Sequence, residues 1–103
     1  MIYSNFKGLK ISRLGFGTMR LPTKDGKIDE KTTEIMFDTA IKAGVNYFDT
    51  AWPYHGVNSE VVTGKLLSKY PRDSYFLADK YPGHQISESY DPADIFEKQL
   101  EKC

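Results

Sequence analysis

The chain has 103 residues, its 14 lysines and arginines balance 14 aspartates and glutamates, and 40% of its residues are apolar. This length suits a single domain, residues 1–103, and the zero net charge gives no electrostatic reason to expect a nucleic acid or an anionic membrane as partner. The longest apolar run, residues 75–78, is far shorter than a membrane span of roughly 20 residues or a signal core of roughly 7 to 15. The only cysteine, Cys103, allows no internal disulfide and no thiolate metal cluster, so we expect a reducing, cytoplasmic setting.

The first half of the chain predicts a hairpin, a strand and a helix. Residues 1–12 indicate a small hairpin around a Lys-Gly pair, and residues 13–18 form a short apolar stretch that ends in small residues, as in a buried strand. A polar loop with an Asp-Gly turn follows. Asp29 is placed to cap a helix that runs to about residue 43, and Gly44 supplies its left-handed stop.

The second half predicts two further strands, each followed by a helix. The expected strands are residues 45–49 and 75–79. The expected helices are residues 58–69, capped by Asn58 or Ser59, and residues 91–103, which follow a loop over residues 81–90 and open on an Asp-Pro pair.

The strands recur at a regular interval. Their apolar segments start at residues 14, 45 and 75, and they are continuous rather than alternating, which is typical of a parallel sheet covered by helices. One more interval would start a fourth strand near residue 105. Eight such units would total about 240 residues, close to the roughly 250 of a TIM barrel. The sequence therefore predicts an α/β fold: an N-terminal hairpin and about three β/α units of a (β/α)8 barrel.

Three residues with proton chemistry follow the predicted strands. Asp49 ends the second strand, Tyr54 lies five residues later in the loop, and Lys80 follows the third strand. Because active sites of α/β sheets form at the C-terminal ends of the strands, which lie about 4.8 Å apart, we expect these side chains to meet. A lysine cation beside a phenol favours the phenolate, the carboxylate holds the ammonium, and the tyrosine can then act as a general acid near neutral pH.

Each of these residues also has an ordinary interpretation. A carboxylate after a strand is often a helix cap or a surface group, a lysine there is often only solvated, and a loop tyrosine is commonly a packing residue. Their joint occurrence at one edge of the sheet is what favours a site over three unrelated surface residues.

Several stretches resemble the N-terminal part of the aldo-keto reductase family. They are residues 15–22 (Gly-Phe-Gly-Thr-Met-Arg-Leu-Pro), 44–51 (Gly-Val-Asn-Tyr-Phe-Asp-Thr-Ala), 54–56 (Tyr-His-Gly), 58–60 (Asn-Ser-Glu) and 79–80 (Asp-Lys). The resemblance covers essentially the whole chain. It implies a (β/α)8 barrel that transfers hydride between NADPH, less often NADH, and a small-molecule carbonyl or alcohol.

The resemblance also implies roles for individual residues. Tyr54 matches the tyrosine that donates a proton to the substrate, Lys80 the lysine beside it, and Asp49 the carboxylate paired with that lysine. The residues that match the border of the nicotinamide are Gly17, Thr18 and Met19, together with Asp49. His55 either lines the substrate pocket or is a solvated loop histidine.

The sequence departs from the family pattern in one important respect. The family's catalytic histidine follows strand 4, which lies beyond residue 103, and neither His55 nor His84 replaces it because they follow strands 2 and 3. The phosphate-binding elements, expected after strands 7 and 8, are also missing. The sequence around Tyr54 and residues 97–103 resemble the branch of the family whose full-length members often carry a C-terminal iron–sulfur segment, which only an extended chain would contain.

We therefore expect an N-terminal fragment of an oxidoreductase that is inactive as 103 residues. Two other interpretations stay open: a noncatalytic nucleotide-binding regulatory subunit, and a truncated product without a function of its own. Three parallel strands have two open edges, so self-association of the chain is also expected.

Overall fold

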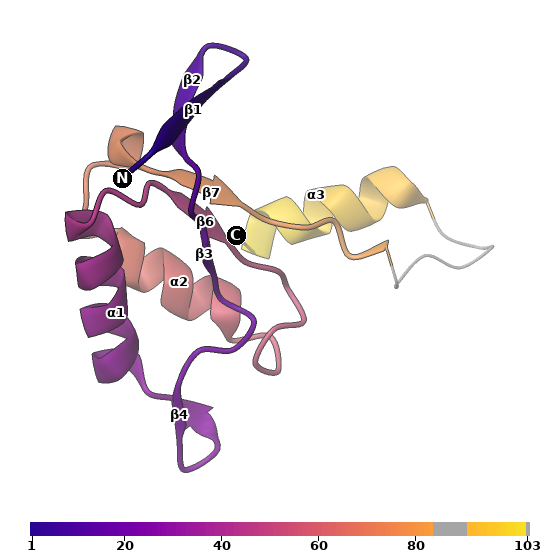
Figure 1. Cartoon of the computed structure of the whole chain (residues 1–103). Coiled ribbons are helices and arrows are strands. Elements are labelled where there is room, and N and C mark those ends of the chain that lie inside the picture. Colours follow the sequence, from indigo (N-terminus) through magenta and orange to yellow (C-terminus); the bar gives the residue numbers. More distant parts are fainter. Residues whose placement is uncertain (84–90, 103) are drawn as a thin grey trace.

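The computed structural model describes residues 1–83 and 91–102, so that His84, Cys103 and most of the predicted 81–90 loop lie outside the described residues. Figure 1 shows the arrangement of the elements. In chain order they are β1 (Tyr3–Phe6), β2 (Leu9–Ser12), β3 (Phe16–Gly17), β4 (Thr23–Lys24), β5 (Lys27–Ile28), α1 (Glu30–Lys42), β6 (Tyr47–Asp49), α2 (Ser59–Leu67), the 3-10 turn η1 (Arg72–Ser74), β7 (Phe76–Ala78) and α3 (Pro92–Lys102). No helix within these described ranges is long and apolar enough to cross a membrane.

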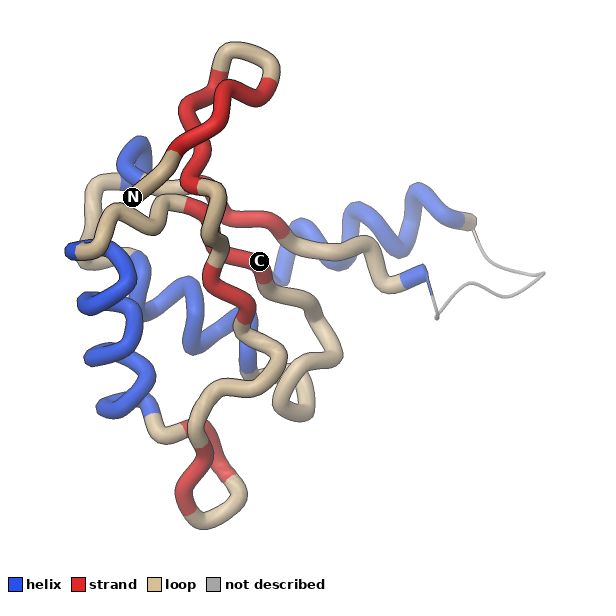
Figure 2. The backbone as a smooth tube through the Cα atoms, in the orientation of Figure 1, coloured by secondary structure: helices blue, strands red, loops and turns tan. Residues whose placement is uncertain are grey.

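Strands β3, β6 and β7 form the predicted parallel sheet, with β6 in the middle. Phe48 pairs with Phe16 on one side and with Leu77 on the other. The paired segments are shorter than expected (Figure 2), with two residues in β3 and three each in β6 and β7. At the start of the first predicted strand, the N–H of Arg13 donates to Ile2, so this end belongs to the hairpin instead.

The hydrophobic core lies between one face of this sheet and helices α1 and α2. Phe37 of α1, Phe48 of β6 and Leu67 of α2 are completely buried and belong to one cluster. The Phe37 and Phe48 rings are 5.1 Å apart between centroids, and Phe16 lies 4.9 Å from Phe37, which are favourable distances for aromatic contacts. Side chains alternate along a strand, so Asp49 projects to the face opposite Phe48.

The ends of the elements confirm most of the predicted turn chemistry. Oδ1 of Asp29 accepts the N–H of Thr32 at 3.1 Å, as expected of a helix cap, and Gly44 adopts a left-handed φ of 93° after α1. Helix α2 differs. Asn58 occupies the cap position, but its amide nitrogen donates to the carbonyls of His55 and Gly56 rather than accepting from the helix. The helix also ends at Leu67, two residues earlier than predicted.

The predicted polar loop before α1 is wrong in one detail. Residues 23–24 and 27–28 pair as a small antiparallel ribbon, β4–β5, because Asp25 and Gly26 both adopt left-handed conformations and make the tight turn that such a ribbon needs. The hairpin predicted for residues 1–12 is confirmed, with Phe6 opposite Leu9 across its turn.

Candidate functional site

Asp49 and Lys80 form an ion pair at the C-terminal edge of the parallel sheet. Asp49 pairs with Ala78 across the strands, and Lys80 comes two residues after Ala78, so the backbone brings the two side chains together. Nζ of Lys80 lies 2.5 Å from Oδ1 of Asp49 and 3.0 Å from the carbonyl oxygen of Thr50. The predicted meeting of these two side chains is therefore observed.

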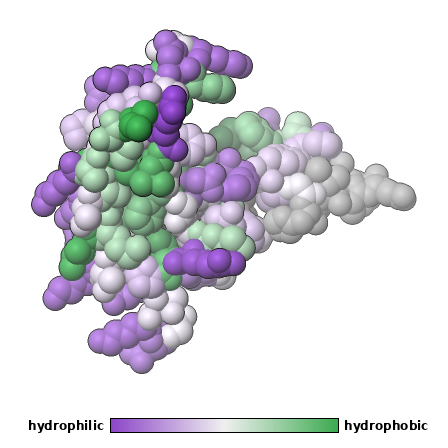
Figure 3. All heavy atoms as spheres, in the orientation of Figure 1, coloured by the Kyte–Doolittle hydropathy of each residue, from purple (hydrophilic) through white to green (hydrophobic). Residues whose placement is uncertain are grey.

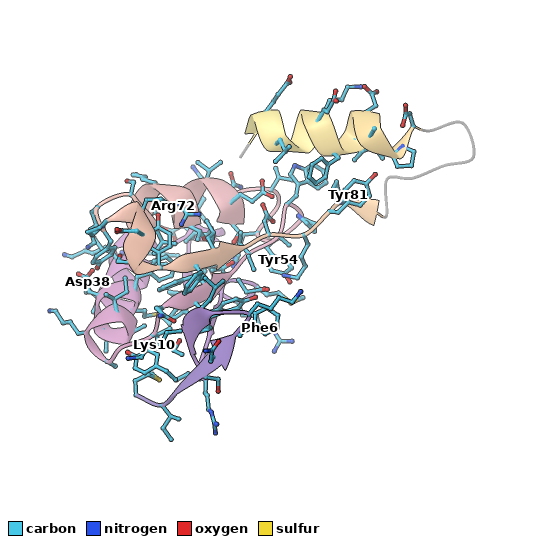
Figure 4. All side chains as sticks on the ribbon, turned by 90° about the horizontal axis from the view of Figure 1, so that it is seen from above. Phe6, Lys10, Asp38, Tyr54, Arg72 and Tyr81 are labelled. Carbon is cyan, nitrogen blue, oxygen red and sulfur yellow. The ribbon has the colours of Figure 1, made fainter. Side chains whose placement is uncertain are left out.

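Tyr54 lies beside this pair. It belongs to the loop between β6 and α2, and Figure 4 shows it near the C-terminal end of β7. Nζ of Lys80 lies 5.0 Å from the centroid of the Tyr54 ring. The lysine thus contacts both a carboxylate and a phenol, and the Lys80 and Asp49 side chains are 47% and 37% exposed, so a small molecule can reach them.

The surroundings of Lys80 favour its charged form. Partial burial lowers the pKa of Lys80, but the hydrogen-bonded carboxylate of Asp49 and the neighbouring phenol of Tyr54 raise it by more, so that the net pKa lies above its ordinary value. Lys80 is therefore a fixed cation at neutral pH. An arrangement of a fixed cation, a carboxylate and a phenol can stabilise a phenolate when the tyrosine gives up its proton.

The residues at the end of β3 differ in what they present to solvent. A Cβ added at Gly17 would meet no atom within 4 Å, and Met19 is 59% exposed, so both border open space next to Asp49, which pairs with Gly17. Thr18 is completely buried instead, and its hydroxyl donates to the carbonyl oxygen of Asp49 at 3.0 Å. Thr18 therefore holds the strand ends together from inside.

His55 has a defined partner. The backbone N–H of Leu21 donates to its Nε2 at 2.9 Å, which ties the loop after β6 to the segment after β3. A neutral ring that accepts at Nε2 has its proton on Nδ1. His55, Gly56 and Val57 all have left-handed φ values, an unfavourable conformation for a β-branched residue such as Val57, so this loop has a specific strained shape.

The sequence pattern did not predict that Ser59 and Thr50 support the candidate site. The two hydroxyls lie 3.0 Å apart and are buried, and Ser59 also donates to Thr18 at 2.9 Å. The available signal was the position of three hydroxyl residues directly after β3, directly after β6 and at the start of α2.

A hollow of about 860 Å³ lies beside the β4–β5 ribbon, and it shares His55 with the loop that holds Tyr54. Its lining does not include Asp49, Tyr54 or Lys80, so we place the candidate site at the sheet edge, where the reactive groups meet. Among the residues that the structure describes, no group of three histidines, cysteines or carboxylates could hold a metal ion.

The sequence of the chain matches that of a known protein family. The family model of the aldo/keto reductases matches residues 13–103, and the chain belongs to that family. Its fold also resembles a thermostable aldo-keto reductase whose crystal structure contains the inhibitor epalrestat, with a TM-score of 0.74 and 28% identity over 98% of this chain and 36% of that one.

Curated relatives point to the same family. L-galactose dehydrogenase of Arabidopsis thaliana is 37% identical over 71% of this chain and 24% of its own length. The NADH-specific methylglyoxal reductase of Escherichia coli is 36% identical over 70% of this chain and 23% of its own length. A probable aldo-keto reductase 1 of Glycine max is 32% identical over 73% of this chain and 22% of its own length. The chain thus spans about a quarter of the length of these relatives.

Proposed function

We propose that this chain supplies the aspartate, tyrosine and lysine of an NAD(P)H-dependent oxidoreductase that interconverts a carbonyl and an alcohol. The observation that carries the proposal is the contact of Lys80 with both Asp49 and Tyr54 at one edge of a parallel sheet. In α/β folds that edge is where active sites form.

In the proposed reaction Tyr54 gives its proton to the carbonyl oxygen of the substrate as hydride reaches the carbonyl carbon. The Lys80 ammonium stabilises the phenolate that remains, and Asp49 holds the ammonium in place. Tyr54 thus contacts the substrate. His55 is the second proposed substrate contact and would act through Nδ1, because Nε2 is already bonded to Leu21.

The residues at the sheet edge fit a nicotinamide. Gly17 leaves open space where a side chain would project, Met19 is exposed, and Asp49 adjoins both, while Thr18 fixes the strand end behind them. We propose that Gly17, Met19 and Asp49 border the nicotinamide of NADPH or NADH, which supplies the hydride when bound, and that the buried Thr18 supports this border from behind. An iron–sulfur cluster is proposed only for an extended chain.

We further propose that the fold is the first part of a (β/α)8 barrel. The three strands, their interval of about 30 residues and the similarity to a solved aldo-keto reductase support this. The family's histidine after strand 4 and its phosphate-binding elements would come from sequence beyond residue 103. The substrate would be a small carbonyl compound in the cytoplasm, without a nucleic acid or membrane partner.

The experiment compares two proteins. One is the 103-residue chain, and the other is the completed chain, extended to the full length of its relatives from its own coding sequence or with the C-terminal part of the E. coli relative. We expect carbonyl-dependent NADPH oxidation by the completed chain and none by the 103 residues. A completed chain that binds NADPH without oxidising it would support a noncatalytic nucleotide-binding subunit instead. A coding frame that stops at residue 103, with no downstream barrel, would support an inactive truncated product.

A further inference from the structure

Three buried hydroxyl groups connect the ends of β3 and β6 to the start of α2. Thr18 and Ser59 are completely buried, and Thr50 is 2% exposed. The hydroxyl oxygen of Ser59 lies 2.9 Å from that of Thr18 and 3.0 Å from that of Thr50. We call Thr18, Ser59 and Thr50 the hydroxyl chain.

The hydrogen bonds of the hydroxyl chain have one consistent direction. Each hydroxyl has a single proton, and that of Thr18 goes to the carbonyl oxygen of Asp49. The hydroxyl of Ser59 donates to the hydroxyl oxygen of Thr18. The oxygen of Ser59 is then left as an acceptor, so the hydroxyl of Thr50 must donate to it. A buried network in which every proton is used keeps its atoms in one arrangement.

Ser59 is linked to the segment that carries each of the three reactive residues. It reaches Asp49 through Thr18, whose backbone N–H and hydroxyl both donate to the Asp49 carbonyl. It reaches Lys80 through Thr50, whose carbonyl accepts from Nζ of Lys80. Its own backbone N–H donates to the carbonyl of Tyr54 at 3.2 Å.

We infer that Ser59 is a positioning residue for the proposed carbonyl reduction. It is too deeply buried to contact a substrate, and it acts by fixing the relative positions of Tyr54, Lys80 and Asp49. The inference rests on the proposed function, since positioning has a meaning only where those three residues react. Misplacement of reacting groups by about 1 Å can cost 10²-fold in rate, so losing the Ser59 hydroxyl should slow the reaction itself.

The same helix provides a matched control. Thr63 lies one turn after Ser59 and is also completely buried, but its hydroxyl has no hydrogen-bond partner within residues 1–83 and 91–102. Thr63→Val removes a buried hydroxyl of α2 without breaking a network. A difference between Ser59→Ala and Thr63→Val therefore reports on the hydroxyl chain and not on the loss of a buried hydroxyl in general.

The test uses the completed chain and measures turnover per NADPH-binding site, which excludes unfolded molecules. For Ser59→Ala we expect kcat per site to fall about 10- to 100-fold with a smaller change in KM for the carbonyl, while Thr63→Val keeps the parental kcat. Parental kcat per site in Ser59→Ala would overturn the inference. A loss confined to the number of NADPH-binding sites, with kcat per site unchanged, would also overturn it, because a merely structural role gives that result.

A second pair of variants covers the case in which Ser59→Ala does not fold. Thr50→Val removes the hydroxyl that donates to Ser59, and Thr50→Ser keeps it, so we expect Thr50→Ser to turn over at least several-fold faster per site. Equal rates would contradict the inference. Tyr54→Phe is measured in parallel. If Tyr54→Phe keeps the parental turnover, the proposed function is wrong. If Tyr54→Phe is slow while Ser59→Ala keeps the parental turnover, only the positioning role of Ser59 is wrong.

Discussion

The buried hydroxyl of Thr63 lowers the stability of the fold. Its hydroxyl is completely buried in α2 and has no partner in the described part of the chain. A valine has nearly the same shape without the polar atom, and an unsatisfied buried donor costs about 1 to 3 kcal/mol. We expect Thr63→Val to raise the free energy of unfolding of the completed chain by about 1 kcal/mol in urea titrations. A lower stability would mean that the hydroxyl has a partner in the full fold.

At the residue level the sequence predicted the reactive side chains better than their supports. Asp49 and Lys80 follow parallel strands, and the geometry of a parallel sheet alone brings such positions together. The partners of His55 and Ser59 could not be predicted, because Leu21 and Thr18 come from a distant segment whose path depends on how the loops fold. Small hydroxyl residues are also common at helix starts, where the usual interpretation is a cap.

At the scale of the element, the start of α1 depends on Asp29. The side-chain hydroxyl and the backbone N–H of Thr32 both donate to this carboxylate and hold the pKa of Asp29 below its ordinary value. A carboxylate with a lowered pKa stabilises the fold above its unfolded pKa and loses that contribution as the pH falls through the folded value, here below about 4.

The prediction compares two variants of this cap in thermal melts of the completed chain. Asp29→Ala should melt below the parent at pH 7, since it lacks the cap altogether. Asp29→Asn keeps a hydrogen-bond acceptor without the charge. The amount by which its melting temperature lies below that of the parent should therefore shrink as the pH is lowered below about 4. A deficit that is the same at all pH values would mean that the charge of Asp29 contributes nothing.

Gly44 lies in the connection from α1 to β6, where the backbone requires a glycine. Its φ is 93°, and a Cβ there would lie 2.6 Å from the Tyr3 hydroxyl and 2.9 Å from Cβ of Met1. We expect Gly44→Ala to lower the free energy of unfolding by about 1 kcal/mol or more. Gly64, inside α2 with no atom within 4 Å of an added Cβ, is the control: Gly64→Ala should be neutral or stabilising by up to about 1 kcal/mol. Equal effects at both glycines would mean that the left-handed φ and the close contacts at Gly44 cost nothing.

Helices and turns were predictable because their signals are local, whereas strand lengths were not. The cap at Asp29 and the stop at Gly44 lie within a few residues of what they control. The extent of β3 depends instead on where β6 offers partners, and the ribbon β4–β5 depends on the pairing of two polar segments that have no apolar pattern. Pairing across strands is not encoded in the period of one segment.

The whole molecule is thin, with extents of 46 × 42 × 19 Å. Figure 3 shows apolar atoms, in green, at the surface of the face toward the viewer, between the β1–β2 hairpin and the β4–β5 ribbon. Large apolar side chains such as Leu14, Met19 and Ile35 are more than half exposed. In the complete barrel that we propose, further layers would cover such surface, whereas in these 103 residues it is exposed.

We therefore expect the 103-residue chain to self-associate. Exposed apolar surface and the two open strand edges of the β3–β6–β7 sheet both favour association. Size-exclusion chromatography with light scattering should show dimers or larger species that grow with concentration, and the completed chain should elute as a discrete species. A sharp monomer peak of the 103 residues, with cooperative unfolding, would show that this fold is complete in itself.

In the proposed reaction Tyr54 donates the proton and Lys80 stabilises the phenolate that results. The most direct test of these two roles is the steady-state reduction of a reactive aromatic aldehyde by the completed chain, measured together with NADPH affinity for Tyr54→Phe and Lys80→Met. Both variants should bind NADPH as the parent does, and turnover of Tyr54→Phe should fall about 10²- to 10⁴-fold because only the acid is lost. If Tyr54→Phe turns over within a few-fold of the parent at unchanged affinity, Tyr54 is a packing residue and the proton-donor assignment is wrong.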